Sequence, residues 1–567
     1  MTTRFSRHDG HAVTALWLMA AVYLFGGLAA MWLFSPRVPY ADGWRFLAHF
    51  LETPFPQDIL TPDNGHREVL PNAVRVFELQ VFSAQQWFQT AVGMVLALAT
   101  LAVAARTLLR EGPATPTVAA AILFVTAGVF WLGNVRALGH GNESVHAYFV
   151  TLFLVVGLAL LSRPPPSAGR ELRDVAVAAV CGIAATFSFG SGIACFVAYA
   201  VVLAIRGVRW PSWALMGGGL LIALLPAWLG SGAQVPFQIA LLAQAEHLPR
   251  WLAAPFVYAL WPLLDPAIAM QIPLGAARVP AHAIAQSTEA TFGPVMLARW
   301  PHMLIGVIGL TWLGMETWRA WRRPLPGVLL GVGIAWFAVA VGGMVVLTRL
   351  EYLQVHPDQL LAPRYVVWSS LFWAGLAIAA TLHVRRPMRA GVLALVTAIM
   401  LLPSQAWMGM QGWLTRGVAE HAALAATTGV VDTGLALGET VPGDLAAALP
   451  ALRATRSGMF AWPEARWLGQ TLQPDDVRVV DASHITVTTV DNRLGEPGRR
   501  VRFTLGSVPG PRLLLVDEDD VVRGLALREF AIGRQGRSKQ WTGWMVDDER
   551  QATPRVAVPL HEHNPSR

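Results

Sequence analysis

The sequence predicts a mostly α-helical membrane protein: a polytopic bundle of about eleven transmembrane helices over residues 1–408, followed by an extracytoplasmic domain over residues 409–567. Three observations lead to this fold class. Of the 567 residues, 54% are hydrophobic and only 14% are charged, whereas roughly 25% of the residues in soluble domains are charged. Long apolar stretches recur through the first region, and the second changes to a two-residue alternation of apolar and polar side chains.

Apolar windows define the predicted transmembrane helices, because a span needs about 20 mainly apolar residues. The first window, residues 12–34, is longer than the roughly 7 to 15 apolar residues of a signal peptide. We therefore expect it to remain as a helix and not to be removed as a leader. The windows begin near residues 12, 85, 115, 144, 175, 191, 211, 302, 326, 364 and 389.

Arginine sets the predicted orientation, because the chain has a single lysine, Lys539, and cytoplasmic loops of membrane proteins collect positive charge. With the N-terminus in the cytoplasm, the arginine-rich loops near residues 106–110, 163–173 and 319–323 all face inward. The net charge of +7 then reflects topology and does not indicate a nucleic-acid partner. An odd number of spans places the residues after 408 outside.

The C-terminal region is predicted to form a small β-sandwich after a helical lead-in at residues 419–427, since segments such as "RRVRFTL" and "KQWTGWMV" alternate in hydrophobicity. It could serve as a folded cap, or it could bind carbohydrate if Trp541 and Trp544 are exposed for stacking. The two cysteines, Cys181 and Cys195, fall inside predicted helices, so we expect no disulfide framework.

The loop between the first two spans, residues 35–84, is too long for a simple connection. Residues 42–52, "DGWRFLAHFLE", and 72–82, "NAVRVFELQVF", each gather their apolar side chains on one helical face. Both stretches suit helices that lie in the membrane interface. Between them stands the polar group His66-Arg67-Glu68, and Asp42 follows the first span.

Two further polar clusters are predicted on the same outer side. One lies at residues 134–146 and includes Arg136; the other lies at residues 349–365 and includes Arg364 and Tyr365. A Gly/Ser break, "TFSFGSG", separates two further spans. Ionisable residues at membrane depth cost roughly 2.5 to 3.5 kcal/mol each on insertion scales. Their convergence on one leaflet therefore predicts a functional site.

The segments "YADGW", "NGHREVLPN", "ATFSFGSG" and "QLLAPRY" resemble those of the GT-C superfamily of membrane glycosyltransferases, in particular bacterial members related to lipid-phosphate-sugar mannosyltransferases and arabinosyltransferases. The resemblance covers roughly residues 1–408. In the superfamily, the acid of the first loop often has a second acid beside it. Here Gly43 follows Asp42, so Glu68 or Asp63 would take that part.

The resemblance implies an inverting transfer of a sugar from a polyprenyl-phosphate donor to a hydroxyl of an envelope glycan or glycolipid, on the outer face of the bacterial inner membrane. Such a reaction needs a base for the hydroxyl proton and cations for the lipid phosphate. Asp42 is the expected base, with Glu68 as the second acid. The expected phosphate ligands are Arg67, Arg136 and Arg364, supported by His66 and Tyr365. No metal ligands are assigned, and the participation of a divalent ion is left open.

Each of these residues has a simpler interpretation. Asp42 could cap the helix that follows it, and Glu68 could only pair with Arg67 or Arg75. Arg364 could be an interfacial anchor, with Tyr365 beside it as an aromatic-belt residue. The spacing of three further residues could gather a metal ion, although a loop network or a helix cap explains them equally well; these are His140, Glu143 and His146.

Two other function classes remain. A transporter of lipid-linked glycans would also bring polar residues close to lipid, but it usually binds its substrate near the bilayer midplane, whereas the charges of this chain cluster outside. A polysaccharide ligase or polymerase would use the same kind of lipid-linked glycan. The long first loop and Asp42 favour the transferase.

Overall fold

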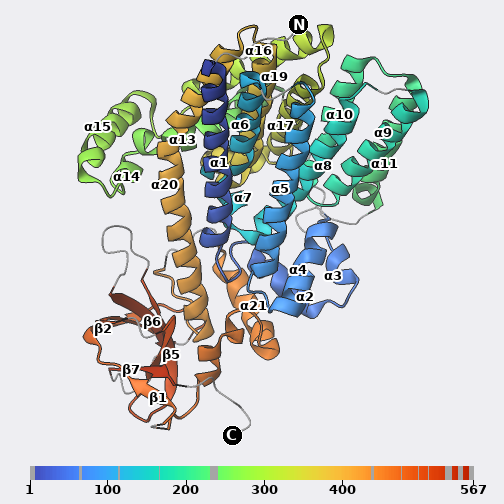
Figure 1. Cartoon of the computed structure of the whole chain (residues 1–567). Helices are drawn as coiled ribbons and strands as arrows, with labels where there is room; N and C mark the ends of the chain where they lie inside the picture. Colours follow the sequence, from blue (N-terminus) through green and yellow to red (C-terminus); the bar gives the residue numbers. More distant parts are fainter. Residues whose placement is uncertain are drawn as a thin grey trace.

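The computed structural model is elongated, with a bundle of long helices at one end and a small β-sheet domain at the other (Figure 1). The N-terminus lies at the end of the bundle far from the sheet. The structure describes residues 7–62, 67–112, 115–164, 167–229, 241–435, 440–473, 475–495, 497–507, 510–529, 539–546 and 553–560.

Within the described residues, seven helical segments are long and apolar enough to cross a membrane, which supports a membrane protein. Most of them coincide with single helices: α1 (Arg7–Phe34), α5 (Trp87–Leu109), α8 (Gly141–Leu161), α17 (Pro326–Thr348), α19 (Pro363–His383) and α20 (Pro387–Thr427). The remaining segment joins α6 (Pro116–Phe130), the 3-10 turn η1 (Leu132–Asn134) and α7 (Val135–Gly139).

Four further helices occupy the other windows where the sequence predicts spans, but they are shorter or less apolar. They are α9 (Ala168–Thr186), α10 (Ala194–Arg206), α11 (Trp210–Leu229) and α16 (Trp300–Arg322), with the 3-10 turn η2 (Gly190–Ile193) before α10. The predicted number of about eleven spans is therefore not confirmed, and neither the type of membrane nor the orientation follows from the structure. Cys181 and Cys195 are buried and free.

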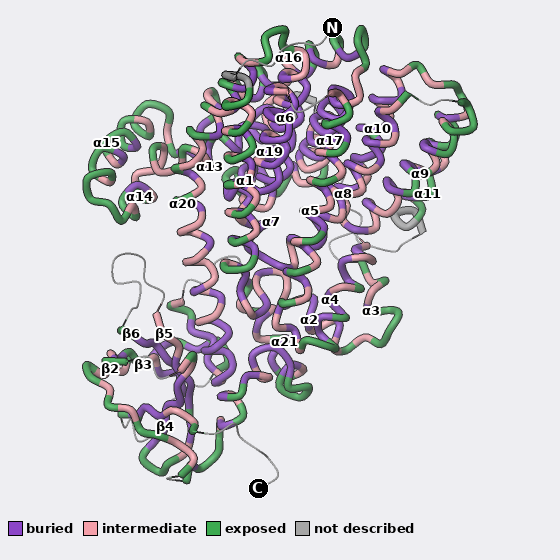
Figure 2. Tube along the Cα trace, in the orientation of Figure 1, coloured by how far each residue is buried: buried purple, intermediate pink, exposed green. Residues whose placement is uncertain are grey.

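The central helices of the bundle are α6, α17 and α19, which carry mostly buried residues (Figure 2). Close approach of α17 and α19 depends on two glycines. A Cβ atom added to Gly331 would lie 2.6 Å from the carbonyl oxygen of Gly375, and one added to Gly375 would lie 2.5 Å from the oxygen of Gly331. Such small residues let membrane helices pack backbone to backbone, and here they fix α19, whose first turn contains Arg364 and Tyr365.

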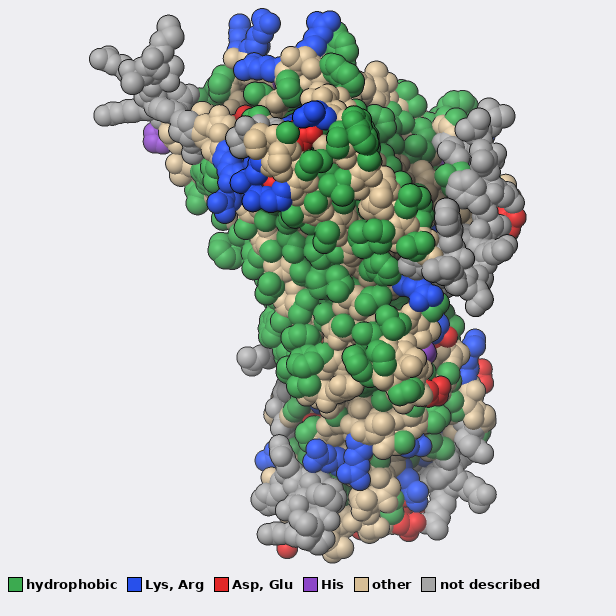
Figure 3. Space-filling view, turned by 90° about the vertical axis from the view of Figure 1, so that its right-hand side faces the viewer, with side chains coloured by type: hydrophobic (Ala, Val, Ile, Leu, Met, Phe, Trp, Pro, Cys, Tyr) green, Lys and Arg blue, Asp and Glu red, His purple; other side chains and the backbone are tan. Residues whose placement is uncertain are grey.

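The arginine-rich loops meet at one end of the bundle. Arg206, at the end of α10, donates a hydrogen bond of 2.5 Å to the carbonyl oxygen of Leu161, at the end of α8. Glu316 near the end of α16 pairs with Arg319 at 2.8 Å and with His383 at 2.6 Å. A space-filling view shows arginines gathered at this end above a broad apolar belt (Figure 3).

The described residues between α11 and α16 form four helices, and two of them protrude from the side of the bundle (Figure 1). These are α12 (Leu241–Leu252), α13 (Ala254–Leu264), α14 (Pro266–Ala269) and α15 (Gly275–Phe292), the last two forming the protrusion. Between α17 and α19 lie α18 (Leu350–Val355) and the 3-10 turn η3 (Pro357–Leu361).

The first long loop forms α2 (Gly43–Glu52), α3 (Gln57–Leu60) and α4 (Val69–Phe82) below the bundle (Figure 1). The sequence predicts that the apolar face of α2 lies in the membrane interface, but the structure shows this face covered by protein. Trp44, Leu47 and Phe50 are instead buried in one hydrophobic cluster with residues of the C-terminal region. Protein packing thus takes the place of the membrane interface for this helix.

Helix α4 has the opposite orientation to α2, because it buries its polar side and exposes apolar residues. Arg75 and Glu78 are almost fully buried, whereas Phe77 and Val81 are exposed. The carboxylate of Glu78 accepts the backbone N–H groups at the start of α5, from Phe88 at 2.6 Å and Gln89 at 3.0 Å, which satisfies donors that a helix N-terminus leaves without partners. The outward apolar face agrees with the predicted interfacial helix.

The long helix α20 continues from the bundle into the C-terminal region, so residue 409, the predicted start of that domain, lies inside a helix. Beyond it come α21 (Pro442–Thr455) and the 3-10 turns η4 (Gly458–Ala461) and η5 (Pro463–Trp467). The strands are β1 (Val477–Val479), β2 (Ser483–Val490), β3 (Gly498–Thr504), β4 (Arg512–Val516), β5 (Val522–Arg528), β6 (Gln540–Val546) and β7 (Arg555–Pro559).

The seven strands form one antiparallel sheet in the order β1-β7-β4-β5-β6-β3-β2. Within the described part of the chain they do not divide into two facing sheets, so the predicted sandwich is not confirmed. Trp541 and Trp544 are both 0% exposed, one on each face of the sheet. Stacking of sugars on these two tryptophans is therefore excluded, because their rings are used in packing.

Candidate functional site

A cavity of about 420 Å³ opens at the end of the bundle that faces the C-terminal domain. Helices α7, α8, α18 and α19 of the bundle form one side, and α2 with the residue before α21 closes the other. Its polar and charged lining residues are Asp42, Glu68, Arg136, Asn142, Glu143, His146, Arg349, Tyr352, Arg364 and Tyr365. A volume of this size is typical of sites for small organic ligands.

The structure brings together most of the residues predicted from the sequence. The cavity is lined by Asp42, Glu68, Arg136, Arg364 and Tyr365, which are far apart in the chain. Their roles in catalysis or phosphate binding stay predictions.

Two predicted residues are not among the lining. Arg67 turns back to its own loop, where Nη1 lies 3.5 Å from the carbonyl oxygen of Leu60. His66 lies outside the residues that the structure describes.

Five charged or titratable side chains form a row beside the cavity, in which an acid and then an arginine follow on each side of a histidine. Nη1 of Arg75 lies 2.5 Å from Oε2 of Glu68, and that oxygen lies 3.9 Å from Nδ1 of His146. On the other side of the ring, Nε2 of His146 lies 3.1 Å from Oε2 of Glu143, whose Oε1 accepts a hydrogen bond of 3.0 Å from Arg136. All five are buried or nearly so, and such groups are tolerated in an apolar interior because each has a partner.

The row bears on the two interpretations of Glu68. It pairs with Arg75, as the simpler interpretation proposed, and also approaches His146. Because Arg75 additionally donates to Oδ1 of Asn72 at 2.7 Å and lies 4.4 Å from the ring centre of Phe46, Glu68 belongs to a fixed network. This geometry favours a positioning role for Glu68 over that of a base that exchanges protons with substrate.

Asp42 is the accessible carboxylate of the cavity. It occupies the N-cap position of α2, yet its side chain makes no capping hydrogen bond and its own backbone is helical, with φ −58° and ψ −18°. The capping interpretation therefore lacks its essential contact. The side chain is 48% exposed, and its carboxylate lies 3.4 Å from Nη1 of Arg45. A carboxylate held at a cavity in this way can accept a proton from a bound hydroxyl.

Arg349, Arg364 and Tyr365 give the opposite wall its positive character. Arg364 donates to Oε1 of Gln359 at 3.2 Å and lies 5.0 Å from the ring centre of Tyr365. Among the described residues, Arg349 has no carboxylate partner, and the buried hydroxyl of Tyr365 has no hydrogen-bond partner. Guanidinium groups and a hydroxyl in this arrangement suit an anionic ligand.

Sequence reasoning placed Arg349 in an outer polar cluster but gave it no role. The signal that was present in the sequence is its position directly after an apolar helix, in the same polar cluster as Arg364. His146 was likewise seen only as a candidate metal ligand. Its position between two acids depends on the packing of α8 against the loop before α4, which residue spacing does not encode.

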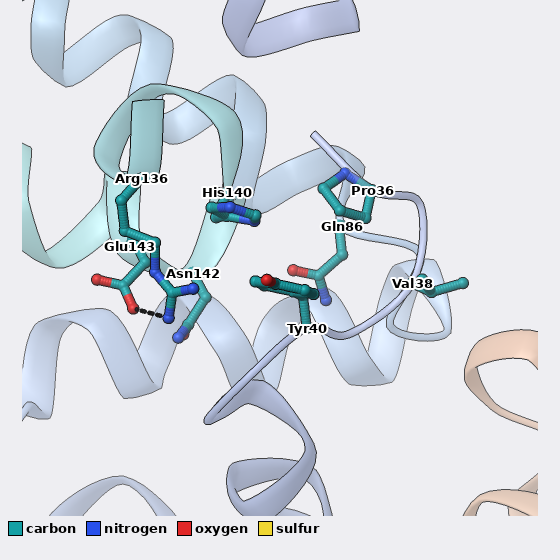
Figure 4. A pocket seen from close by; sticks show the side chains of 9 residues that line it. Pro36, Val38, Tyr40, Gln86, Arg136, His140, Asn142 and Glu143 are labelled. Atoms are coloured by element: carbon teal, nitrogen blue, oxygen red, sulfur yellow. Dashed lines mark hydrogen bonds and ion pairs between the residues drawn. The ribbon is translucent and has the colours of Figure 1, made fainter. Parts of the chain in front are cut away.

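A second, much smaller cavity of about 10 Å³ adjoins the first and shows how Arg136 is held (Figure 4). The ring of Tyr40 stacks on that of His140, with centres 4.5 Å apart, and Arg136 lies 5.3 Å from the Tyr40 ring centre. Burial, with a contribution from the neighbouring Arg136, lowers the pKa of His140 to about 3, so this ring is neutral at physiological pH. This small cavity has room for no more than water. Its lining residues, such as Tyr40 and His140, serve to pack the wall of the larger cavity.

His140, which precedes α8, and Glu143 and His146 within α8 all make other contacts. His140 stacks on Tyr40, while Glu143 and His146 belong to the charged row. No group of three or more His, Cys, Asp or Glu side chains in the described ranges has a geometry that could hold a metal ion.

The Gly/Ser break acts as a tight turn that supports the cavity wall. A Cβ atom on Gly192 would lie 2.0 Å from the carbonyl oxygen of Ala185, so only glycine fits this close approach. The turn carries Phe189 into the cavity lining, where its ring stacks on His146 with centres 4.3 Å apart.

Comparison of the chain with protein-family models, with curated proteins and with solved structures found no match.

Proposed function

We propose that this protein is an inverting glycosyltransferase of the GT-C type that transfers a sugar from a polyprenyl-phosphate donor to a hydroxyl of an envelope glycan or glycolipid. The reaction takes place at the cavity, on the outer face of the bacterial inner membrane. The proposal rests on the sequence resemblance over residues 1–408 and on the chemistry of the cavity.

One observation carries the proposal: a single cavity holds an accessible carboxylate and a separate cationic wall. Asp42 stands on the side of α2, while Arg349 directly precedes α18 and Arg364 and Tyr365 lie in α19. A glycosyl transfer needs this pairing, with a base for the hydroxyl proton and cations for the leaving phosphate. Arginine suits the second task because its planar fork binds two phosphate oxygens at once.

In the proposed reaction, the acceptor oxygen attacks the anomeric carbon of the donor sugar from the face opposite the phosphate. The new C–O bond forms as the bond from the anomeric carbon to the phosphate oxygen breaks, so the configuration inverts. Asp42 takes the proton of the acceptor hydroxyl, and the electron pair of the broken bond leaves with the polyprenyl phosphate. Arg349, Arg364, Arg136 and the Tyr365 hydroxyl stabilise the negative charge that develops there.

The proposal includes a topology of about eleven crossings, with the N-terminus in the cytoplasm and the C-terminal domain outside. The arginine-rich end of the bundle supports this orientation, because positive loops stay in the cytoplasm (Figure 3). A reporter active only in the cytoplasm, fused after Arg567, should be silent, whereas the same reporter fused after Arg323 should be active. Activity of the first fusion would place the cavity on the wrong side.

Two other functions share the lipid-linked substrate and are separated by their products. A polysaccharide ligase or polymerase would transfer a whole glycan, and a transporter would move the lipid-linked glycan without breaking a bond. The position of the cavity at the ends of α8, α18 and α19, away from the helix midpoints, supports a surface reaction over transport.

The test uses purified protein in nanodiscs with polyprenyl-phosphate hexoses or pentoses and envelope glycolipid extracts as acceptors. We expect polyprenyl phosphate and an acceptor heavier by one sugar, identified by mass spectrometry. Transfer of intact polymers would instead establish ligation, and an unchanged donor in the presence of all acceptors would contradict the proposed function.

A further inference from the structure

The segment before Asp42 has a backbone conformation that needs support. Ala41 has φ +52°, in the left-handed region that side chains other than glycine rarely adopt, and it is buried at the cavity wall. A residue keeps such a conformation only when its surroundings hold it there. What holds Ala41 therefore also fixes the position of Asp42.

Two contacts from the C-terminal region hold this segment. The backbone N–H of Ala41 donates a buried hydrogen bond of 3.1 Å to Oγ1 of Thr440. Nη1 of Arg45 lies 3.4 Å from the carboxylate of Asp42 and 4.0 Å from that of Asp444, so it joins the two acids. Both partners come from the region outside the bundle, at and just before the start of α21.

The residues on either side of Ala41 are fixed by different parts of the molecule. Upstream, Tyr40 stacks on His140 of the bundle (Figure 4). Downstream, Trp44 and Leu47 of α2 pack in the hydrophobic cluster that contains Leu445 of α21. Asp42 thus stands at the junction between the bundle and the C-terminal domain, and its position depends on both.

We propose that the C-terminal domain positions the base of the reaction, with Thr440 and Asp444 as positioning residues that hold Asp42 against the acceptor hydroxyl. This inference rests on the proposed function. It assigns the domain a part in the transfer step that goes beyond covering the membrane bundle. Because a base must lie within hydrogen-bond reach of the proton it takes, a small displacement of Asp42 slows transfer without changing how the phosphate is bound.

The experiment compares Thr440→Val, which keeps the shape and loses the acceptor oxygen, with the matched control Thr440→Ser, which keeps the oxygen. Loss of one buried hydrogen bond should lower kcat roughly three- to tenfold in the valine variant. KM for the donor should stay unchanged, because the cationic wall of Arg349 and Arg364 is not touched. The serine variant should have a kcat close to that of the wild type, and Asp444→Asn should lower kcat in the same direction as valine.

Two further readouts separate positioning from a general loss of structure. Amide hydrogen exchange of a peptide that contains Ala41 should be faster in Thr440→Val, while exchange in the bundle stays the same. In the Asp42→Asn background, Thr440→Val should cause no further loss of the residual turnover, because both changes act through the same carboxylate.

An unchanged kcat in folded Thr440→Val, or an equal loss of kcat in Thr440→Ser, would overturn the inference. So would a further loss of turnover in the double variant. If the wild-type protein transfers no sugar, the proposed function fails, and the exchange measurement alone tests whether Thr440 holds the segment at Ala41. Faster exchange at Ala41 in Thr440→Val then supports this contact, and unchanged exchange rejects it.

Discussion

The two ends of the helical bundle carry the same residue type in opposite environments. At the end far from the sheet, arginines such as Arg322 and Arg323 stand exposed at helix termini. At the cavity end, Arg75 and Arg136 are 4% and 5% exposed, and both are paired with acids in a continuous row. The number of arginines at one end of the bundle is therefore less informative than how deeply each arginine is buried.

Solvation explains why the two ends are built differently. An exposed guanidinium keeps its water and needs no partner, so loop arginines can vary as long as the loop remains positive. A buried guanidinium must be paired or must face an anion, because desolvating an unpaired charge is costly. The cavity end is therefore expected to respond strongly to substitutions that the other end tolerates.

The largest effect is expected from Asp42→Asn. Removal of a general base lowers the rate roughly 10²- to 10⁴-fold, while donor binding should change little because the cationic wall remains. Turnover and donor affinity are measured on the purified protein, with Asp475→Asn, an exposed acid of the C-terminal domain, as the matched control. Near-normal turnover of a folded Asp42→Asn protein would remove Asp42 as the base.

Breaking the buried row should have the next largest effect. Arg75→Ala leaves Glu68 buried without its closest partner, which we expect to destabilise the protein by about 3 to 5 kcal/mol. Arg323→Ala at the opposite end should change the free energy of unfolding by less than about 0.5 kcal/mol. Thermal unfolding in detergent measures both, and equal midpoints for the two variants would contradict the contrast between the ends.

A smaller effect is expected where the charge is kept and only the geometry is lost. Arg364→Lys and Arg349→Lys should each lower kcat/KM roughly 10- to 100-fold, because lysine cannot bind two phosphate oxygens with a planar fork. Arg323→Lys serves as the control. If lysine at residue 364 supports normal transfer, Arg364 is an interfacial anchor and not a phosphate ligand.

The smallest effect is expected from Arg67→Ala. The sequence predicted weaker donor binding for this change, whereas the structure shows Arg67 on its own loop, outside the cavity lining. We therefore expect kcat/KM to fall by less than about threefold, in line with surface substitutions. A tenfold or larger rise in KM for the donor would contradict this expectation and would show that Arg67 takes part in donor binding.

The sequence predicts best where a local pattern determines the structure. Apolar windows gave the positions of the helices, and the alternation in "KQWTGWMV" and "RRVRFTL" identified two strands of the sheet. The co-location of Asp42, Arg136 and Arg364 was also foreseen, because membrane topology alone brings outer loops to one leaflet. Each of these inferences needs only periodicity or charge.

The features that the sequence does not predict depend on which part of the protein packs against a given helix or sheet face. Helices α2 and α4 have similar amphipathic patterns, yet α2 buries its apolar side against the C-terminal domain and α4 exposes Phe77 and Val81. Burial of Trp541 and Trp544 follows from packing on both faces of one sheet. The pairing of Glu68 with Arg75, and its approach to His146, depends on tertiary contacts that no spacing reveals.

The most direct test of the account is the location of the donor phosphate. Cryo-electron microscopy of the protein in nanodiscs with a polyprenyl-phosphate sugar should show density for the phosphate in the cavity, within contact distance of Arg349 and Arg364, with the sugar directed toward Asp42. An empty cavity, with the lipid phosphate bound instead among the arginines at the opposite end of the bundle, would contradict the account.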